Sequence, residues 1–422
     1  MAQVLVIGSG AREHAIAQTL LRSPQVDQVV IAPGNDGMTD PGLVIKPIAA
    51  TAIAELIAFV QGAKIDLTIV GSEEPLTLGI VDAFQQAGLP IFGPTAYAAQ
   101  LEGSKAFSKQ VLAANHIPTA ASDVATSLTD AYAKATQFGF PVVVKQDGLA
   151  LGKGVTIVKN TAQLTALLTA IYAKDAAQKL VIEEYLAGVE FSIFSFVGEL
   201  GVVHAPIAQD HKRLLDQNAG PNTGGMGAYS PVRWLSNAIR EEAIQTLVEP
   251  VLAGMQASGH PFTGILYTGV MLTEKGPKVI EFNVRLGDPE AQIVLPQLES
   301  DFYQMLLDLL AGQQPEVVWQ DADIYLGVVL AAPGYPVKPE KGLPVPVITG
   351  DDLHMNYAGV IQQDDALVVN GGRVVTVVGR AQSATAAAAK IYAALDALDT
   401  RLQYRHDIGY QAVQAENETK AL

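Results

Sequence analysis

The first hundred residues alternate short apolar runs with stretches of helical character. Runs rich in valine, isoleucine and leucine predict strands, and the longer stretches between them predict helices. The predicted strands lie at 4–7, 29–31, 67–70 and 90–92, and the predicted helices at 13–21, 53–60 and 79–87. Because this order is typical of a parallel sheet with crossover helices, the segment predicts a parallel α/β domain. Such sheets bind ligands at the carboxyl ends of their strands.

The pattern beyond residue 100 predicts further mixed α/β structure. Strands at 141–144 and 155–158 flank a glycine-rich turn at 148–154, and residues 210–229 predict a long polar loop. We expect the remaining strands at 180–184, 189–197, 325–331, 366–369 and 374–378, a hairpin at 264–282, and helices at 102–115, 163–173, 238–257, 290–310 and 381–395. The sequence Asn370-Gly371-Gly372 predicts a turn between two of the last strands.

Length and composition exclude several classes of function. A chain of 422 residues suggests two to four domains. The 27 Lys and Arg against 43 Asp and Glu give a net charge of −16, which argues against a nucleic-acid or anionic-membrane partner. The absence of cysteine excludes disulfides and thiolate chemistry. No secretory signal pattern and no apolar run of about 18 residues is found, so we expect a cytoplasmic location.

The first candidate motif is the glycine turn from Gly8 to Gly10 that follows the first predicted strand. It fails as a dinucleotide fingerprint, because Glu13 occupies the third glycine position. Asn35 also lies in the region where a ribose-binding acid is expected. A turn onto a helix N-terminus still suits one phosphate group, so we favour a phosphorylated ligand other than NAD. A turn needed only for packing is the alternative.

The glycine-rich turn at 148–154 is the second candidate. It is not a Walker A loop, because three residues rather than four separate its glycines and Gly154 follows Lys153. Backbone N–H groups of such a turn can close over phosphate oxygens, and Lys145 and Lys153 would add positive charge for a polyphosphate. An ordinary hairpin turn with solvated lysines is the alternative.

Two groups of carboxylates follow predicted strands. Glu183, Glu184 and Glu190 could accept ribose hydroxyls, with the backbone between them pairing with an adenine edge; a solvated charge cluster is the alternative. Strand alternation places Glu281 on one face with Asn283 and Arg285. Oxygen ligands beside an arginine suit Mg²⁺ held between protein and phosphates, whereas a structural salt-bridge ladder is the alternative.

The long loop at 210–231 is dense in glycine, and loops of this length in compact enzymes are usually functional or disordered. His211 could act as a base, although a lone histidine with basic neighbours is more often a satisfied or surface residue. No Gly-x-Ser-x-Gly elbow occurs, so a serine hydrolase triad is not supported. The other histidines lack metal-ligand spacing.

Together these motifs resemble the ATP-grasp fold, and several longer strings resemble one family within it, the glycinamide ribonucleotide synthetases (phosphoribosylamine–glycine ligases). The strings lie at 10–15, 32–35, 100–105, 220–231 and 405–409, and the resemblance covers nearly the whole chain. The string at 220–231 is the one that separates this family from other ATP-grasp ligases. Four positions depart from the family pattern without removing a charged ligand, namely Ala11, Ser72, Gln146 and Val284.

The resemblance implies ATP-dependent ligation of glycine to 5-phosphoribosylamine. Glycine would attack the γ-phosphate of ATP to give glycyl phosphate. The amine would then displace phosphate and form glycinamide ribonucleotide, a step of purine biosynthesis. This transfer requires positioning and charge neutralisation rather than an enzyme nucleophile. ATP and Mg²⁺ or Mn²⁺ are the implied cofactors, and we expect a monomer.

The resemblance also implies roles for individual residues. ATP phosphates would be held by Lys105, Lys145 and Lys153, with Gly152 and Gly154 shaping the loop over them. Glu183 and Glu184 would flank the adenine, and Glu190 would bind the ribose. Glu281 and Asn283 would ligate the metal, and Arg285 would stabilise charge at the transferred phosphate. Asp210, Lys212 and Asp288 would face the substrates, and Gly8, Gly10 and Asn35 would lie near the ribose phosphate.

The expected fold is α/β and α+β multidomain. We expect an N-terminal parallel α/β domain at 1–102, a central ATP-grasp domain at 103–120 and 191–325, a lid at 121–190, and a C-terminal α/β domain at 326–422. Two alternatives share this fold: another carboxylate–amine ligase, and a non-catalytic nucleotide-binding sensor. An NAD oxidoreductase is weakened by Glu13 and by the missing acid after the second strand.

Overall fold

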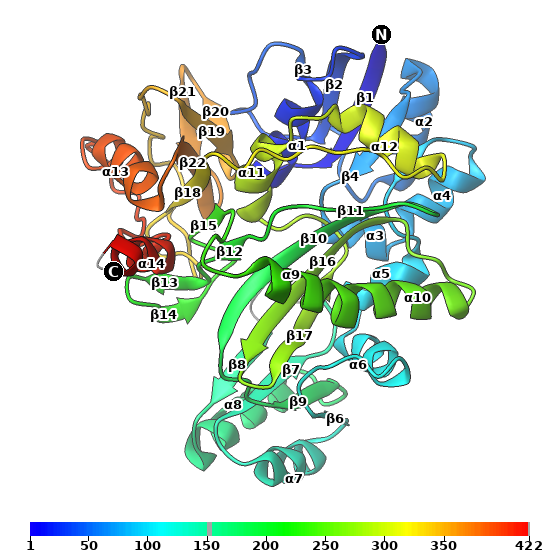
Figure 1. The fold of residues 1–422 in the computed structure, drawn as a ribbon, viewed down its shortest axis with the longest axis vertical. Coiled ribbons are helices and arrows are strands. Elements are labelled where there is room, and N and C mark those ends of the chain that lie inside the picture. Colours follow the sequence, from blue (N-terminus) through cyan, green and yellow to red (C-terminus); the bar gives the residue numbers. More distant parts are fainter. Residues whose placement is uncertain (150–153, 421–422) are drawn as a thin grey trace.

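A computed structural model describes residues 1–149 and 154–420 of the chain (Figure 1). The N-terminal part is a parallel sheet in the order β3-β2-β1-β4-β5, which confirms the predicted parallel α/β arrangement. Its strands are β1 (Ala2–Gly8), β2 (Val26–Pro33), β3 (Leu43–Ile45), β4 (Leu67–Val70) and β5 (Ile91–Phe92), and its helices are α1 (Ala11–Leu20), α2 (Ile53–Ala63), α3 (Glu73–Thr77) and α4 (Ile80–Gln86). The sequence pattern missed β3, a short edge strand with no fully buried residue to mark it.

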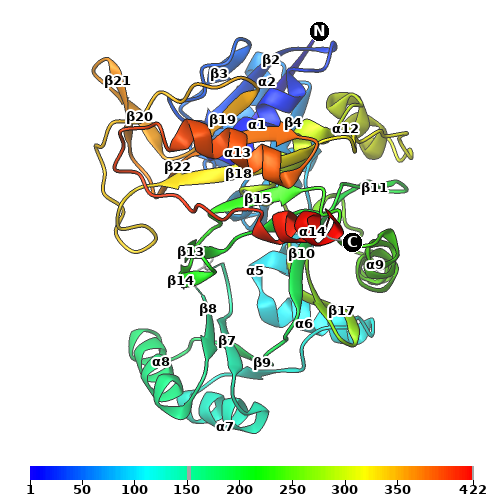
Figure 2. The same cartoon turned by 60° about the vertical axis from the view of Figure 1, so that its left-hand side comes forward.

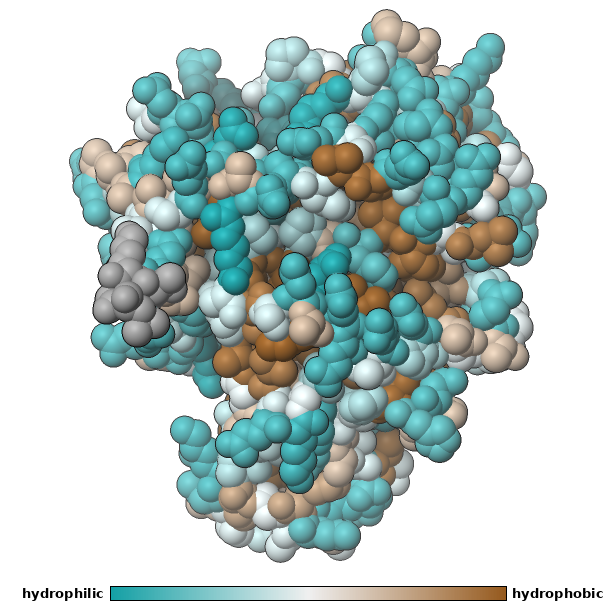
Figure 3. All heavy atoms as spheres, viewed as in Figure 1, coloured by the Kyte–Doolittle hydropathy of each residue, from teal (hydrophilic) through white to brown (hydrophobic). Residues whose placement is uncertain are grey.

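A second lobe projects from the body and has a hydrophobic core of its own (Figure 1). Its sheet has the order β6-β9-β7-β8 and is antiparallel throughout. The elements are β6 (Ser122–Ala125), α7 (Leu128–Phe138), β7 (Val142–Gln146), β8 (Val155–Val158), α8 (Thr161–Lys174) and β9 (Leu180–Glu184). The predicted strand, loop, strand order therefore holds, with β7 and β8 paired. Its surface is largely hydrophilic in Figure 3, as expected for a lobe whose apolar side chains face inward.

The central sheet has the order β11-β10-β16-β17 and is also antiparallel. Its strands are β10 (Val189–Val197), β11 (Val202–His204), β16 (Gly264–Thr273) and β17 (Gly276–Asn283). Helices of this region are α5 (Ala96–Gly103), α6 (Lys105–Ala114), α9 (Asn237–Ala243) and α10 (Glu249–Ala257), with a π-helical turn at Ile244–Val248. The predicted hairpin is β16–β17. The helix predicted at 102–115 is instead two helices, because the Ser104 side chain caps a new helix start by accepting from Phe107 N.

The C-terminal part contains a sheet in the order β12-β15-β18-β22-β19 (Figure 2). Its strands are β12 (Gln209–Asp210), β15 (Gly227–Ser230), β18 (Ile324–Ala331), β22 (Arg373–Ala381) and β19 (Leu353–Tyr357). Two separate ribbons pair β13 (Arg213–Leu215) with β14 (Ala219–Asn222) and β20 (Val360–Gln363) with β21 (Ala366–Val369). The helices are α11 (Glu290–Val294), α12 (Phe302–Leu310), α13 (Ala384–Leu395) and α14 (Tyr410–Lys420), with a 3-10 turn at Leu295–Gln297.

Two local expectations for this part are wrong, and a third is confirmed. Residues 210–229 are not a long loop: they form short strands, and β15 pairs with β18 over a sequence separation that local patterns do not encode. The helix predicted at 290–310 is broken, because Pro296 lacks an N–H group for a continuing α-helix. The turn predicted at residues 370–372 does connect two strands, β21 and β22, although these strands pair with others: β21 with β20, and β22 with β18 and β19.

The segment at 405–409 joins the end of the chain to the β13–β14 ribbon. Arg405 is fully buried and forms two contacts with the Asp407 carboxylate, at 2.7 and 2.9 Å. The same guanidinium donates to Arg213 O and Asn218 Oδ1, and Asp407 accepts from Gln217 N. Helix α14, which follows this segment, therefore lies beside the ribbon (Figures 1 and 2).

We expect Arg405→Met to lower the free energy of unfolding by about 3 kcal/mol, because it leaves the Asp407 carboxylate without its partner. Urea denaturation followed by circular dichroism measures this. The control is Arg401→Met, which removes an exposed pair with Glu340 and should cost less than about 1 kcal/mol. Equal losses in the two variants would contradict the structural role of the buried pair.

Candidate active site

Two adjoining cavities lie where the lobe, the central sheet and the terminal parts meet. The smaller cavity has a volume of about 270 Å³ and the larger about 780 Å³. They share the side chains of Lys145, Glu183, Asp210, Lys212 and Glu281. The shared lining is thus rich in charge of both signs, which suits a charged ligand spanning both cavities.

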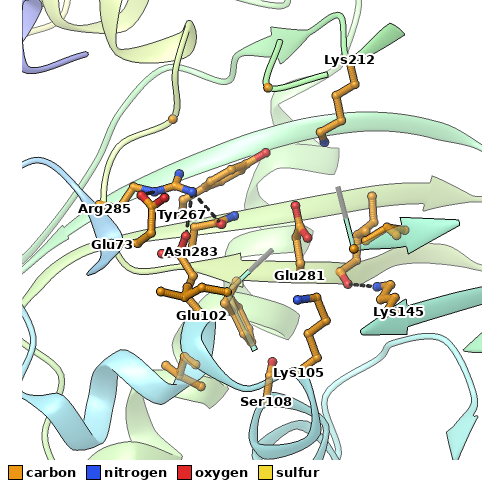
Figure 4. Close-up of a pocket in the computed structure, with 18 of the residues that line it drawn as sticks. Glu73, Glu102, Lys105, Ser108, Lys145, Lys212, Tyr267, Glu281, Asn283 and Arg285 are labelled. Carbon is orange, nitrogen blue, oxygen red and sulfur yellow. Dashed lines mark hydrogen bonds and ion pairs between the residues drawn. The ribbon is translucent and has the colours of Figure 1, made fainter. Parts of the chain in front are cut away.

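The end of β17 brings three predicted residues into the smaller cavity: Glu281, Asn283 and Arg285 (Figure 4). The pairing of β17 with β16 shifts register between Gly269 and Val270, so that Ile280 is an extra residue on the β17 side. Such a bulge bends the strand and frees backbone groups from the ladder. The Ile280 carbonyl accepts a hydrogen bond of 3.0 Å from Lys145 Nζ.

Arg285 is held by acceptors from separate parts of the chain (Figure 4). Its guanidinium contacts Glu102 Oε1 at 2.7 Å and Glu73 Oε2 at 3.2 Å. It also donates to Asn283 Oδ1 at 3.0 Å. Glu102 in addition accepts from Val284 N, and so fixes the backbone next to Arg285. The guanidinium is therefore fixed in one orientation at the wall of the cavity.

Glu73 is shared between two guanidinium groups, because Arg12 Nη2 lies 3.5 Å from the oxygen that Arg285 contacts. Burial alone would raise the pKa of Glu73, but Arg285 and Arg12 outweigh burial and lower it to about 2. Glu102 differs: burial dominates there and raises its pKa despite Arg285. Glu73 is thus the firmly ionised partner in this network.

Glu281 faces lysines from three segments. Burial would raise the pKa of Glu281, but Lys212, Lys145 and Lys105 lower it below its usual value. The carboxylate therefore stays ionised inside the cavity. Within residues 1–149 and 154–420, no group of three or more His, Cys, Asp or Glu side chains could hold a metal. A cation there would need non-protein oxygens, such as phosphates, to complete its ligand shell.

Lys105 and Lys145, which the sequence analysis assigned to the ATP phosphates, both line the smaller cavity (Figure 4). Lys105 Nζ donates to Gly148 O at 2.9 Å, and burial lowers the pKa of Lys105. Gly154 also lines this cavity. Gly152 and Lys153, which the sequence analysis assigned to the same loop, lie outside the described residues.

Lys212 and Asp210 also lie between the two cavities. Lys212 forms an ion pair with Glu190 and lies 3.7 Å from Asp210 Oδ1. Burial would lower the pKa of Lys212, but Asp210 and Glu190 raise it well above its usual value. Burial raises the pKa of Asp210, with Glu290 adding to the rise. Lys212 is therefore firmly charged and paired with Glu190, while its neighbour Asp210 is the more readily protonated group.

The carboxylates at the end of β9 have partners within the protein. Glu183 lies between Lys145, at 2.9 Å, and Lys109, at 3.2 Å. Glu184 accepts from Ala121 N at 3.0 Å and pairs with Lys278 at 3.3 Å. The larger cavity beside them has a partly apolar wall, made by Val143, Val155, Ile157, Leu186, Met271 and Ile280. A flat apolar base would fit such a wall.

The N-terminal glycine turn does not line either cavity. Gly10 N donates to Glu13 Oε2 at 2.6 Å. Asn35 joins Ser9 O to Tyr357 O through its amide nitrogen. Asp288 does line the smaller cavity and pairs with Arg373 at 3.0 Å. A Cβ on Gly10 would lie 3.6 Å from Asp288 Oδ2, so the turn lies behind that carboxylate.

Comparison with known proteins matches nearly the whole length of the chain. Models of the phosphoribosylglycinamide synthetase N domain, ATP-grasp (A) domain and C domain match residues 2–102, 103–291 and 325–411. A phosphoribosylamine–glycine ligase of Streptococcus pyogenes serotype M18 is 47% identical, with 98% of this chain and 100% of the relative covered. That of Lactococcus lactis is 46% identical, covering 97% and 100%. The chain belongs to the phosphoribosylglycinamide synthetase family.

Solved structures agree with this family. The crystal structure of phosphoribosylamine–glycine ligase from Thermotoga maritima is similar with a TM-score of 0.84 and 32% identity, covering 97% of this chain and 100% of that one. The biotin carboxylase domain of 2-oxoglutarate carboxylase from Hydrogenobacter thermophilus, in complex with MgADP, has a TM-score of 0.72 at 16% identity, covering 95% and 91%. The second likeness shows the fold alone. The expected ATP-grasp fold and phosphoribosylglycinamide synthetase family are both confirmed.

Family membership also confirms the predicted ATP-dependent ligase class. Among the helices described for residues 1–149 and 154–420, none is long and apolar enough to cross a membrane.

The sequence analysis missed several residues of this synthetase site. Arg12, Glu73, Glu102, Lys109 and Arg373 all line the smaller cavity. Glu73 lies three residues after the end of β4, at the start of α3, in the region where ligand residues of a parallel sheet are expected, so that signal was present. Arg373 gave no signal, because its contacts with Asp288 and Gly224 span long stretches of sequence.

Glu73→Gln tests the ionised carboxylate between the two arginines. Because its folded pKa is about 2, against an ordinary value of 4.5, Glu73 stabilises the fold above pH 4.5 and loses this contribution as the pH falls toward 2. We expect the variant to be about 3 kcal/mol less stable at neutral pH. Urea unfolding should show this difference shrinking between about pH 5 and pH 3. A difference that stays constant over this range would contradict the charge network.

Proposed function

We propose that the two cavities form the site at which this chain joins glycine to 5-phosphoribosylamine at the expense of ATP. The observation that supports this best is the convergence of Glu281, Asn283 and Arg285 with Lys105 and Lys145 at the smaller cavity. An ATP-grasp ligase needs oxygen ligands for a metal, cations for the phosphates, and a fixed positive group near the transferred phosphate. The identity of the two substrates comes from the family, because the relatives are named phosphoribosylamine–glycine ligases.

The larger cavity would take the nucleoside part of ATP. Its apolar wall suits the adenine, with Glu184 beside it, and Glu190 lies where a ribose hydroxyl could be accepted. Glu190 now pairs with Lys212, so ribose binding would add an interaction or replace part of that pair. The triphosphate would then extend into the smaller cavity, toward Lys145 and Lys105. Lys153, Gly152 and Gly154 would belong to the loop that covers it.

Glu281 and Asn283 fit a hard divalent cation, because a carboxylate and an amide oxygen two residues apart project from the same strand face. We assign the cation as Mg²⁺, or Mn²⁺ in its place. When bound, it would neutralise phosphate charge. Asn283 Oδ1 already accepts from Arg285, and its second lone pair remains suited to a metal.

The reaction proceeds in two steps that need no covalent enzyme intermediate. A glycine carboxylate oxygen bonds to the γ-phosphorus, and the bond from that phosphorus to ADP breaks. The amine of phosphoribosylamine then bonds to the carbonyl carbon of glycyl phosphate, phosphate leaves, and the amine loses a proton. Arg285 is held where it can stabilise charge on the phosphoryl group. Lys212, Asp210 and Asp288 would face the two substrates.

Several broader assignments accompany this proposal. Gly8, Gly10 and Asn35 would lie near the ribose phosphate of the amine substrate, next to the region of Asp288. The chain would work as a cytoplasmic monomer without nucleic-acid or membrane partners. We retain the domain limits 1–102, 103–120 with 191–325, 121–190 and 326–422 as proposals.

An ADP-release assay tests the function directly. We expect ADP release over many turnovers to require ATP, a divalent cation, glycine and phosphoribosylamine together, because glycyl phosphate is consumed and the site freed for the next ATP only when the amine attacks. Each component is omitted in turn, and the product is identified by mass. Release with a different amine but not with phosphoribosylamine would favour another carboxylate–amine ligase. Binding of ATP with no turnover would favour a sensor.

Glu281→Gln tests the proposed metal ligand. We expect it to lower kcat at least about a hundredfold, since the neutral amide no longer attracts the cation or balances the lysines. The thermal unfolding midpoint checks the fold. Glu274→Gln is the control, because Glu274 is an exposed carboxylate in the turn of the same hairpin. Equal activity of the two variants would overturn the metal assignment.

A further inference from the structure

A buried carboxylate between two lysines joins the lobe to the body. Glu183 Oε2 lies 2.9 Å from Lys145 Nζ, and Glu183 Oε1 lies 3.2 Å from Lys109 Nζ. Glu183 and Lys145 belong to adjacent strands of the lobe, β9 and β7, whereas Lys109 belongs to helix α6 of the body. The ATP-binding role of the site uses Lys145, but it gives Lys109 no task.

The two lysines differ in the donors that remain for a ligand. Lys109 Nζ donates to Thr119 Oγ1 at 2.9 Å and to Ala120 O at 3.0 Å, and Glu183 is its third partner. An ammonium group has three N–H donors, so these acceptors match its full set. Lys145 uses two donors within the described part of the chain, on Ile280 O and Glu183. Its third donor is left for a phosphate.

We propose that Lys109 is a positioning residue for ATP binding, which shares the charge of Glu183 and thereby leaves Lys145 available to the phosphates. This inference rests on the proposed function, in which Lys145 contacts ATP. With Lys109 charged, the Glu183 carboxylate is divided between two cations. Without that charge, Glu183 would attract Lys145 alone, at 2.9 Å and away from water, and would compete with ATP for it.

Lys109 loses its positive charge within the pH range in which enzyme activity can be measured. Burial lowers the pKa of Lys109 to about 8; Glu183 and Glu184 oppose this shift, and Lys145 adds to it. Lys109 is therefore charged below pH 8 in the free enzyme and loses its proton above it. Burial also lowers the pKa of Lys105, so a variant of Lys109 is needed to distinguish the titration of Lys109 from that of Lys105.

The first experiment compares pH profiles of kcat/KM for ATP, which report ionisations of the free enzyme. In the unmodified enzyme we expect this value to fall above about pH 8. Lys109→Arg keeps a positive charge at all these pH values, so the fall should move to higher pH. An unchanged fall near pH 8 in Lys109→Arg would overturn the proposal, because Lys105 or another group would then cause it.

The second experiment asks whether Lys109 acts through Glu183. Binding of a non-hydrolysable MgATP analogue is measured for Lys109→Met, Glu183→Gln and the double variant, with thermal unfolding to check each fold. We expect Lys109→Met alone to weaken binding by roughly tenfold, but by less than about twofold when Glu183 is already Gln. Equal losses in both backgrounds would mean that Lys109 contacts ATP directly, and would overturn the proposal.

A matched control is Lys134→Met. Lys134 also joins a helix to a strand within the lobe, through Asp130 and Val124 O, but it lines neither cavity. It should leave analogue binding unchanged, and an effect as large as that of Lys109→Met would show a general loss of lobe structure instead. The binding of the MgATP analogue is measured without glycine or amine, so it reports on Lys109 even if the enzyme shows no turnover. Failure of the proposed ligase reaction would appear only in the turnover assay, and the two failures can therefore be told apart.

Discussion

The site depends on one guanidinium held between carboxylates from different parts of the chain. Glu73 comes from the start of helix α3 in the N-terminal part, and Glu102 from α5, the helix that leads into the central part. Neither carboxylate is near Arg285 in sequence, so the contact forms only when the two parts pack together. Since Glu102 also accepts from Val284 N, the same contacts place the end of β17 and with it Asn283. The orientation of this end of β17 is thus a consequence of how the parts of the chain pack together.

A chain with a net charge of −16 can still form a site for anions, because the relevant charges are local. Lys105, Lys145 and Lys212 surround Glu281, and Arg12 and Arg285 surround Glu73. Each carboxylate lowers the cost of burying the cations near it, and the cations in turn keep the carboxylate ionised. At Asp210 and Glu290, burial outweighs the attraction of Lys212 and raises the carboxylate pKa instead. The site therefore carries positive charge without an excess of basic residues.

Sequence patterns predicted those features that depend on neighbours along the chain. The alternation predicted for residues 279–285 placed Glu281, Asn283 and Arg285 together at one cavity, although β17 ends at Asn283, and the apolar runs located β1, β2 and β4. The patterns failed where strands that pair are far apart in the sequence. Strands β12 and β15 join a sheet whose other strands begin about a hundred residues later. Arg373 was missed for the same reason, because a lone arginine on a strand carries no sign of a partner such as Asp288.

Glu183 shows that a sequence motif can predict that a residue lies at the site without predicting which group the residue contacts there. As one of two adjacent glutamates after a strand, it was assigned to the nucleotide, yet both of its oxygens face lysines of the protein. Strand alternation requires Glu183 and Glu184 to point to opposite faces of β9. Glu183 consequently faces Lys145 and Lys109, whereas Glu184 lies near Lys278. The buried member of the pair must be neutralised by the protein even before ATP binds, and this requirement explains why a second lysine lies beside the first.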